Sequence, residues 1–394
     1  MGEDGERIFK TMHIAIDARM YYIHGGHGRY LRELIKNLEQ LDTANQYTII
    51  LKPEGAALYF PQNPNFKTVI TKTHWYTLGE QLAFARLLNK LNADLAHFPH
   101  WNVPLLYRRP FVVTIHDLIL RAYPHSAVST RNPLLFWIKY LGFRIVLRHA
   151  LTRAVHIITI SNATREQIFE SYPELLTQIT VIQQAASPTV ISTEPSEGGR
   201  VEKSTDNAKP NLLYIGTAYP HKNLPFLLHA FHQFGIRYGR THQLILAGAR
   251  SIFYDRLLAT DNAKTLLESG DLLYLDGPDD ATLETLYQNA TAVICPALIE
   301  GFGLPALEAA SRGVPVIASR IPAFVEVLGD TAAYFNPHDI ESLIAALHAV
   351  CHPERVRLGG RVEGPHPSLI SRSRQFSWRR TAEETIKIYR ALND

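Results

Sequence analysis

Short apolar segments alternate with longer amphipathic segments along most of the chain. The N-terminal half contains five apolar runs of strand length: MHIAIDAR, QYTIILK, ADLAHF, FVVTIHD and VHIITIS. Between them lie segments of helical periodicity, such as LGEQLAFARLLNKL and GRYLRELIKNLEQL. In the latter, apolar residues recur at helical spacing at Leu31, Leu34, Ile35, Leu38 and Leu41. This alternation predicts a parallel sheet covered by helices on both faces.

The same pattern restarts in the second half of the chain. The strand candidates there are NLLYIGT, HQLILAG, DLLYLDG, TAVICPA, VPVIAS and AAYFN. Residues 191–209 are polar, lack apolar periodicity and are typical of a linker or a long surface loop. We therefore predict an α/β protein with two doubly wound, Rossmann-like domains, 1–190 and 210–375, followed by a C-terminal helix, 376–394.

Length and composition agree with two ordinary globular domains. A chain of 394 residues exceeds the size of one hydrophobic core, and its 46% hydrophobic and 20% charged residues exclude a disordered chain. A formal net charge of +3 without a basic run excludes nucleic acid as the expected partner. The polar N-terminus and the absence of a long apolar run lead us to expect a cytoplasmic protein. The two cysteines, Cys295 and Cys351, show no metal-ligand or redox spacing.

One apolar stretch, residues 131–154, raises the question of membrane contact. It combines large apolar residues with four cations, Lys139, Arg144, Arg148 and Arg153. At about 100° per residue these cations are scattered around the helix and do not line one face. The pattern favours a mostly buried helix over a membrane-surface helix, with a peripheral contact at the inner face of the membrane as the alternative.

The segment EGFGLPALEAASRGVPVIAS has the features of a ligand-binding turn. The preceding strand is expected to end near Pro296, and Pro305 suits the first position of a helix that Gly313 ends. Gly301 and Gly303 allow the backbone to approach a ligand closely. Exposed N–H groups and the positive end of the dipole make a helix N-terminus a phosphate site.

Two carboxylates flank this predicted phosphate site. Glu308 lies about one turn inside the helix, roughly 5 Å along its axis, where it suits the hydroxyls of a ribose. Glu300 lies before the turn, on the other side of the phosphate. The arrangement suits a nucleotide sugar. Two alternatives remain: a structural turn with two surface glutamates, and a dinucleotide-dependent oxidoreductase, because GFGLPA also fits G-x-G-x-x-A.

The same segment resembles the signature of the retaining glycosyltransferases of family 4, which have the two-domain GT-B fold. LYIGTAYPHKNLPFLLHAF resembles the family's donor-phosphate turn, VVTIHDLI its His-Asp segment, GGHGRYLREL its N-terminal glycine loop, and FSWRRTAEETIKIYRAL its C-terminal helix. The resemblance covers nearly the whole chain. GRYLREL, HDLI and P-x-K-N together resemble the mannosyltransferase-type branch of surface polysaccharide assembly.

The resemblance implies roles for individual residues. Glu300 would contact the donor sugar and Glu308 the ribose, while Lys222 would neutralise the diphosphate. His116, at the end of its strand, would approach the reacting centre and form the catalytic set together with Lys222 and Glu300. The implied donor-binding set is Gly216, Thr217, Lys222, Glu300, Gly301, Phe302, Gly303, Leu304 and Glu308.

The resemblance also implies a role for the N-terminal domain and for the C-terminal helix. Two positions depart from the family pattern. The N-terminal domain would bind a glycan or lipid-linked sugar acceptor through the glycine loop Gly26, His27 and Gly28, and the C-terminal helix would pack back toward that domain. Thr217 stands where the family commonly has arginine, so the charge clamp would depend more on Lys222. His221 stands where a second cation is frequent.

Several further residues are interpreted as structural. Asn223 is expected to cap the helix that follows Lys222. His97 and His100 have a spacing that suits a metal, but no third ligand is evident, so we expect both to serve packing.

The chain contains no Asp-x-Asp motif of the kind that holds a divalent ion in metal-dependent transferases. Lys222 and the helix N-terminus would instead stabilise the charge on the leaving diphosphate. We therefore expect no metal and no cofactor, with transfer from GDP-mannose that retains the anomeric configuration. A UDP-linked hexose as donor, a covalent route through a carboxylate, and a catalytically inactive sugar-nucleotide sensor are the open alternatives.

Overall fold

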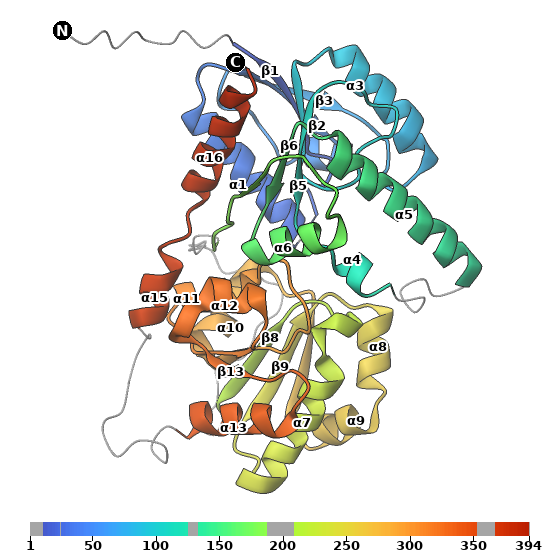
Figure 1. The fold of residues 1–394 in the computed structure, drawn as a ribbon. Helices are drawn as coiled ribbons and strands as arrows, with labels where there is room; N and C mark the ends of the chain where they lie inside the picture. The colour runs from blue at the N-terminus through green and yellow to red at the C-terminus, as the bar shows by residue number, and fades with distance from the viewer. Residues whose placement is uncertain (1–10, 24, 125–132, 187–208, 353–366, 394) are drawn as a thin grey trace, which may run out of the picture. The chain divides into compact units, whose positions relative to one another are not determined.

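The computed structural model describes residues 11–23, 25–124, 133–186, 209–352 and 367–393 (Figure 1). They form two compact units: residues 1–184 with 377–394, and residues 185–376. Residues 191–208 of the predicted linker lie outside the described residues. Among those described, no helix is long and apolar enough to cross a membrane.

The first unit is built on a seven-stranded parallel sheet with the strand order β3-β2-β1-β4-β5-β6-β7. Ile16 of β1 lies opposite Ile49 of β2 on one side and His97 of β4 on the other. The strands are β1 His13–Asp17, β2 Gln46–Leu51, β3 Phe66–Ile70, β4 Leu95–Phe98, β5 Phe111–Ile115, β6 His156–Thr159 and β7 Ile179–Val181. The helices are α1 Gly26–Leu41, α2 Pro53–Ala56, the π-helical turn η1 Glu80–Phe84, α3 Ala85–Leu91, α4 Ile119–Ala122, α5 Pro133–Arg153, α6 Asn162–Ser171 and α16 Trp378–Ala391.

Helices cover both faces of this sheet. Phe84 of η1, Phe143 of α5 and Ile168 of α6 share one apolar core with the central strands. On the other face α16 packs along α1, and its Tyr389 hydroxyl hydrogen-bonds the buried His97 of β4 at 2.5 Å. The last helix of the chain is thus part of the first unit.

The second unit contains a six-stranded parallel sheet with the order β10-β9-β8-β11-β12-β13. Its strands are β8 Asn211–Ile215, β9 Gln243–Gly248, β10 Leu272–Asp276, β11 Ala290–Cys295, β12 Val316–Ser319 and β13 Ala333–Phe335. Its helices are the 3₁₀ turn η3 Pro220–Lys222, α7 Leu224–Tyr238, α8 Ile252–Leu258, α9 Asp261–Glu268, α10 Asp280–Asn289, α11 Leu304–Ser311, α12 Pro322–Leu328, the 3₁₀ turn η4 Gly329–Thr331, α13 Ile340–Cys351 and α15 Pro367–Ser373. Helices α7, α8, α9 and α13 share the main apolar core with the sheet, and α11, α12 and α15 pack on one another.

In both sheets the strand order reverses at one place. The reversal falls between β1 and β4 in the first unit and between β8 and β11 in the second. Loops that leave adjacent strands at such a point diverge to opposite faces, so a crevice opens at the carboxyl ends of the strands. These two switch points are where ligand-binding residues are expected.

All of the predicted strands are present, which confirms the doubly wound α/β class. Two strands, β3 and β7, were not predicted. Both lie at an edge of the first sheet, and Ile70 of β3 is 58% exposed. An edge strand that is partly exposed lacks the continuous apolar run of a strand buried on both faces, which is why the pattern did not reveal it.

The expectation of a mostly buried helix at 131–154 is only half correct. Phe143 and Leu147 of α5 are buried in the first unit's core, but Trp137 and Leu141 are 52% and 58% exposed.

A glycine contact at the second switch point gives a test of this fold. A Cβ added at Gly248 would lie 2.0 Å from the Gly216 carbonyl oxygen and 2.8 Å from the Tyr254 hydroxyl. We expect Gly248→Ala to destabilise the protein by about 1–3 kcal/mol through overpacking. Gly142→Ala is the control. A Cβ at Gly142 meets nothing within 4 Å, and the substitution replaces a glycine within a helix, so it should not destabilise the protein. Thermal melting that is unchanged in Gly248→Ala would contradict the close packing of this turn.

Candidate active site

Two turns meet at the switch point of the second unit. One follows β8 and leads through Gly216 and Thr217 to the short turn η3, which ends at Lys222. The other follows β11 and leads through Glu300 and Gly303 into α11. The turns are joined because the Leu298 N–H donates to the His221 carbonyl oxygen at 2.8 Å. The sequence motifs predicted to bind a donor are therefore neighbours in space.

An ion pair connects the two turns at their polar side. The Lys222 ammonium donates to a carboxylate oxygen of Glu300, 78 positions further along the chain. Both side chains are partly buried, at 18% and 16% exposure, where solvent screens the attraction less than at an open surface. Burial, followed by the charge of Glu300, raises the pKa of the nearby Cys295 thiol to about 12, so this cysteine stays neutral.

Two tyrosines that the sequence analysis did not identify fix the turn after β8. The Tyr254 hydroxyl donates to the Gly216 carbonyl oxygen at 2.7 Å, and the Tyr214 hydroxyl donates to the Thr217 carbonyl oxygen at 2.6 Å. The Gly216 N–H in turn donates to Ala247 of β9 at 3.0 Å. These bonds hold the backbone of the predicted donor turn in one conformation.

The turn before α11 requires glycine. Gly303 has a φ of 94°, and a Cβ at this position would lie 2.6 Å from the Phe324 ring. Phe302 is 2% exposed and its ring packs edge-on against Phe376 at 5.7 Å. Phe302 can therefore offer a ligand only its backbone. Leu304 begins α11, so its N–H belongs to the helix N-terminus, as predicted.

Glu308 is held from a neighbouring helix. Its carboxylate is 7% exposed and accepts a hydrogen bond of 2.8 Å from the Tyr287 hydroxyl of α10. Because a buried carboxylate is costly without donors, Tyr287 stabilises the orientation of this group. Sequence reasoning missed Tyr287, since nothing in LYQNATAVIC points to a partner 21 positions away.

Asn223 is the N-cap residue of α7, as expected, but its side chain makes no capping bond. Asn223 has a backbone φ of 60°, and its side-chain amide donates to the Pro337 carbonyl oxygen at 3.0 Å. It thereby ties the end of η3 to the loop after β13. The neighbouring His221 is 9% exposed and stacks on Tyr219, with ring centroids 5.8 Å apart.

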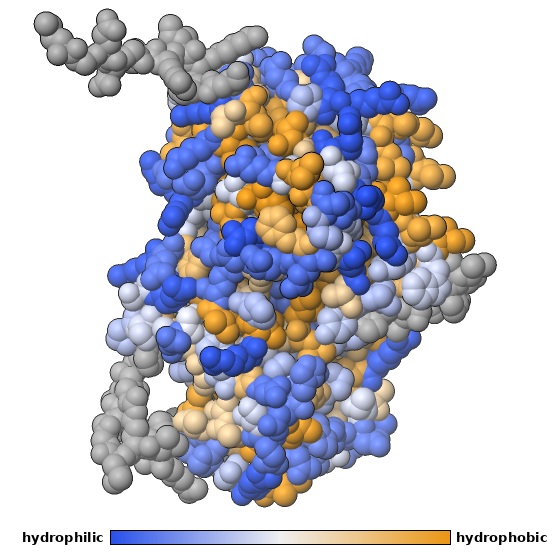
Figure 2. Space-filling model, viewed as in Figure 1, coloured by the Kyte–Doolittle hydropathy of each residue, from blue (hydrophilic) through white to orange (hydrophobic). Residues whose placement is uncertain are grey.

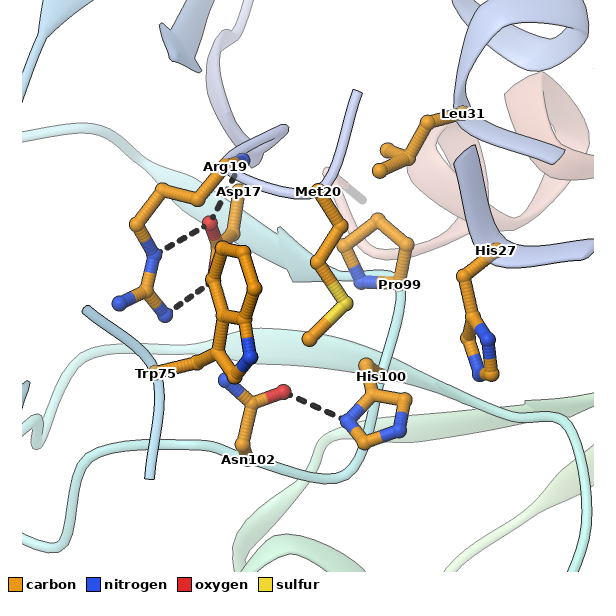
Figure 3. A pocket seen from close by; sticks show the side chains of 9 residues that line it. All are labelled: Asp17, Arg19, Met20, His27, Leu31, Trp75, Pro99, His100 and Asn102. Atoms are coloured by element: carbon orange, nitrogen blue, oxygen red, sulfur yellow. Dashed lines mark hydrogen bonds and ion pairs between the residues drawn. The ribbon is translucent and has the colours of Figure 1, made fainter. Parts of the chain in front are cut away.

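A pocket lies at the switch point of the first unit (Figure 3). Its lining comes from the loop after β1, the first turns of α1, the loop after β3 and the loop after β4. The lining residues are Asp17, Arg19, Met20, His27, Leu31, Trp75, Pro99, His100 and Asn102. Figure 3 shows Trp75, Met20 and His100 grouped around this space, with Arg19 bonded to Asp17 at its side.

A buried charge network fixes three of the loops that line the pocket. The Arg19 guanidinium donates to Asp17 at 2.8 and 2.7 Å and to Glu80 at 2.5 Å. Glu80 also accepts from the Asn102 side chain at 2.7 Å and from the Tyr76 N–H at 2.9 Å. Since Arg19 and Glu80 are each 1% exposed, this network acts inside the unit and orders the loops after β1, β3 and β4.

Three histidines form a cluster beside the pocket. His27 lies 4.9 Å from His100 and 4.6 Å from His116 between ring centroids. His27 and its flanking glycines lie in the first turn of α1 rather than in a loop, because α1 begins at Gly26. A Cβ at Gly28 would lie 1.9 Å from the Ile23 carbonyl oxygen, so this position requires glycine.

His116 is buried and both of its ring nitrogens are engaged. Burial, then the neighbouring His27 and His100, lowers its pKa well below the ordinary value of 6.5. Its Nε2–H donates to the Pro99 carbonyl oxygen at 2.9 Å, and its Nδ1 accepts from the Gln184 amide at 3.0 Å. The ring is thus neutral and held in one tautomer, which leaves no nitrogen free for proton transfer. Its catalytic role stays a prediction.

His97 is confirmed as a packing residue. It is fully buried, and its ring bonds the hydroxyls of Tyr389 and Thr114 at 2.5 and 2.8 Å. Within the described part of the chain, no group of three His, Cys, Asp or Glu side chains is placed to hold a metal ion.

Comparison with known proteins matches both halves of the chain. Residues 24–187 match the family model described as glycosyltransferase family 4, and residues 199–358 match the model of glycosyl transferases group 1. An O-antigen chain mannosyltransferase B from Escherichia coli is 28% identical over 93% of this chain and 96% of its own length. The O-antigen chain mannosyltransferase RfbU of Salmonella typhimurium is 28% identical over 72% of this chain and 74% of its own length.

Solved structures show the same fold. Sucrose-phosphate synthase from Thermosynechococcus elongatus superposes with a TM-score of 0.73 at 19% identity, covering 97% of this chain and 99% of that one. Anabaena HepE in complex with UDP and glucose gives a TM-score of 0.68 at 16% identity, covering 96% and 100%.

Two doubly wound units of this kind form the GT-B fold. The family models and the curated relatives identify the chain as a hexosyltransferase. The chain belongs to glycosyltransferase family 4 and is similar to the mannosyltransferases of O-antigen synthesis.

The buried histidines of the first unit predict a loss of stability in acid. Burial lowers the pKa of His97 to about 3 and lowers those of His27, His100 and His116 below 6.5. Below about pH 6.5 the unfolded chain therefore binds more protons than the folded one, and the free energy of unfolding falls by up to about 1.4 kcal/mol per pH unit for each such group.

The melting temperature, measured between about pH 7.5 and about pH 5, tests this pH dependence of stability. The melting temperature should fall as the pH falls, and His97→Gln should weaken the dependence. His338→Gln, at an exposed position, is the control and should leave it unchanged. A melting temperature that stays level across this range would show that the histidines titrate normally in the folded protein.

Proposed function

We propose that the enzyme transfers mannose from GDP-mannose to a glycan or lipid-linked sugar acceptor during surface polysaccharide synthesis, with retention at the anomeric carbon and without a metal ion. The observation that carries the donor site is the pairing of Lys222 with Glu300 beside the N-terminus of α11. One cation, one carboxylate and a helix N-terminus meet at the switch point of the second unit.

A donor diphosphate would exchange partners with this ion pair. Phosphate oxygens at the first turn of α11 would attract the Lys222 ammonium, which now bonds Glu300. The Glu300 carboxylate would then be released to accept hydrogen bonds from sugar hydroxyls. Glu308, already oriented by Tyr287, would accept from the ribose. The ion pair thus holds both groups next to the proposed diphosphate site.

The reaction breaks the bond between the anomeric carbon and a diphosphate oxygen. Negative charge builds up on that oxygen. Lys222, once it has exchanged Glu300 for the diphosphate, and the α11 N-terminus would supply positive potential there. The acceptor oxygen would bond to the same face of the anomeric carbon and pass its proton to the departing diphosphate. The engaged ring nitrogens of His116 favour this route over one that uses His116 as base.

The names of the relatives favour mannose as the transferred sugar. A UDP-linked hexose is the alternative donor. Two similar proteins carry the name O-antigen chain mannosyltransferase. HepE was solved with UDP and glucose, but at 16% identity that likeness supports the fold alone. Thermal stabilisation by a panel of GDP- and UDP-linked sugars distinguishes the two, because a ligand of the native state raises the melting temperature.

The pocket of the first unit is the proposed acceptor side. Trp75 offers an aromatic face for a sugar ring, and Asp17 offers a carboxylate for its hydroxyls. The first-turn N–H groups of α1 at Gly26, His27 and Gly28, the residues that the family resemblance assigns to the acceptor, would contact an acceptor phosphate.

The oxidoreductase alternative has little support. GFGLPA follows β11, the fourth strand of its sheet in chain order, whereas a dinucleotide fingerprint belongs after the first strand, here β8. Titration with reduced nicotinamide, followed by fluorescence, should show no binding.

Glu300→Gln and Lys222→Met test the charge arrangement. We expect each to lower kcat for sugar transfer by about 10²–10³, because a preorganised charge at the reacting group is lost. The measurement is nucleotide release from GDP-mannose, with and without EDTA, and nuclear magnetic resonance of the product for the anomeric configuration. Lys264→Met, at an exposed lysine of α9, is the matched control. Turnover at the wild-type rate in Glu300→Gln would refute the assignment, and activity abolished by EDTA would refute metal independence.

Tyr287→Phe tests how Glu308 is held. Removal of this hydrogen bond to a buried carboxylate should weaken donor binding by roughly 10- to 150-fold, which corresponds to about 1.5–3 kcal/mol. Isothermal titration with the donor nucleotide measures the effect. Tyr334→Phe loses a comparable bond, to the Gly329 carbonyl oxygen, and should bind the nucleotide normally. Equal affinity in both variants would mean that the bond between Tyr287 and Glu308 does not support nucleotide binding.

A further inference from the structure

His100 has one ring nitrogen that makes no short hydrogen bond in the fold. The residue lies in the loop after β4 and lines the pocket at the first switch point (Figure 3). Its Nδ1 lies 2.7 Å from the Oδ1 atom of Asn102. Among the described residues, the hydrogen-bonding group next to its Nε2 is the Tyr76 hydroxyl, at 3.5 Å, which is longer than an ordinary O–H hydrogen bond. His97 and His116, by contrast, have both ring nitrogens in shorter bonds.

The hydrogen bonds behind His100 determine which of its nitrogens carries the proton. The Glu80 carboxylate accepts from the Arg19 guanidinium at 2.5 Å and from the Tyr76 N–H at 2.9 Å, so it acts as an acceptor on both oxygens. Asn102 must therefore turn its NH₂ group to Glu80, at 2.7 Å, and its Oδ1 to His100. Because an amide oxygen only accepts, Nδ1 of His100 carries the hydrogen and Nε2 keeps its lone pair.

The imidazole of His100 is neutral at pH 7. Burial, followed by the charge of His27, lowers the pKa of His100 well below 6.5. The lone pair on Nε2 is therefore available to accept a hydrogen bond from a ligand. A sugar hydroxyl is a donor of this kind.

Tyr76 is held beside Nε2 in a strained conformation. Its φ of 62° lies in the left-handed region, which is unfavourable for a bulky residue, and the bond from its N–H to Glu80 holds it there. Its ring stacks on Trp101 at 5.0 Å between centroids. Trp101 packs in turn on Phe143 of α5, the helix whose course in Figure 1 is followed by a band of apolar side chains in Figure 2. Backbone strain that the surroundings maintain in this way is typical of a functional position.

The size of the pocket limits what can reach His100. Its enclosed volume is about 10 Å³, close to the space that one water molecule requires. A sugar hydroxyl has the size of a water molecule, whereas a whole sugar ring is too large to enter. A ring that stacks on Trp75 at the side of the pocket would therefore extend a single hydroxyl inward.

We propose that Nε2 of His100 accepts a hydrogen bond from one hydroxyl of the acceptor sugar, and that the Tyr76 hydroxyl donates to the same sugar. Arg19, Glu80 and Asn102 act through these two residues as positioning residues. His100 orients the hydroxyl and takes no proton, so the proton still passes to the departing diphosphate. The inference rests on the acceptor role proposed for this pocket and does not depend on the identity of the donor.

Nitrogen nuclear magnetic resonance of the full chain, with isotope-labelled histidine, tests the proposal without any nucleotide. His100→Gln identifies the His100 signals, which should show a protonated Nδ1 and an unprotonated Nε2. Methyl glycosides of mannose, glucose, galactose and N-acetylglucosamine are then added in turn. At least one should shift the Nε2 resonance, and one of its deoxy analogues should fail to do so.

A protonated Nε2 in the free protein would overturn the proposal. A Nε2 resonance that none of the four glycosides shifts would overturn it too, as would a shift that every deoxy analogue also causes. These readings use the unsubstituted protein, so they stand even if a His100 variant folds poorly.

Sugar transfer distinguishes binding from a merely structural role. We expect His100→Phe and Tyr76→Phe each to raise the KM for the glycoside that shifts Nε2 by roughly 3- to 10-fold, while the KM for GDP-mannose stays unchanged. His100→Gln should recover part of the loss, because its amide oxygen can also accept. His338→Phe, at an exposed position of the second unit, is the matched control and should leave both KM values unchanged.

A glycoside KM that is unchanged in His100→Phe, or an equal rise in both KM values, would refute the role of His100. Absence of any transfer from GDP-mannose by the wild type would instead contradict the proposed function. In that case the resonance titration with the glycosides still decides whether His100 binds a sugar.

Discussion

The ion pair between Lys222 and Glu300 is the constraint on which the donor side of this enzyme depends. It joins two turns that the chain separates by 78 positions, and it can form because β8 and β11 are neighbours in the sheet. A buried ion pair gains little net stability, since desolvation offsets most of the attraction. What it determines is position: each charge is held where a diphosphate and a sugar would need it.

The first unit uses the same device at its own switch point. Arg19 is bonded to Asp17 after β1 and to Glu80 after β3, and Asn102 after β4 completes the network. Removing one member would leave an uncompensated charge in the interior, which is far more costly than the net worth of the network. In both units, partly or fully buried charges thus fix the loops at the switch point and position the residues that would contact a ligand.

Helix α5 shows how an exposed apolar face can be concealed in the pattern of the sequence. When apolar residues lie on two opposite faces of a helix, their contributions to its amphipathicity cancel. The sequence of α5 therefore resembles that of a uniformly buried helix. Buried Phe143 and exposed Leu141 are indistinguishable by residue type, and only their surroundings assign them to the core and to the surface.

The sequence by itself determined the doubly wound architecture, the strands buried on both faces and the motif turns, because apolar periodicity and glycine chemistry are local properties of the chain. It also placed the start of a helix at Pro305, one residue after Leu304, where α11 begins. Only the tertiary structure decided that Lys222 pairs with Glu300, that Tyr287 holds Glu308, that the side chain of Asn223 bonds Pro337 rather than capping α7, and that both nitrogens of His116 are engaged. These contacts join residues 17 to 114 positions apart, and their partners are set by strand order and packing, which no local pattern records.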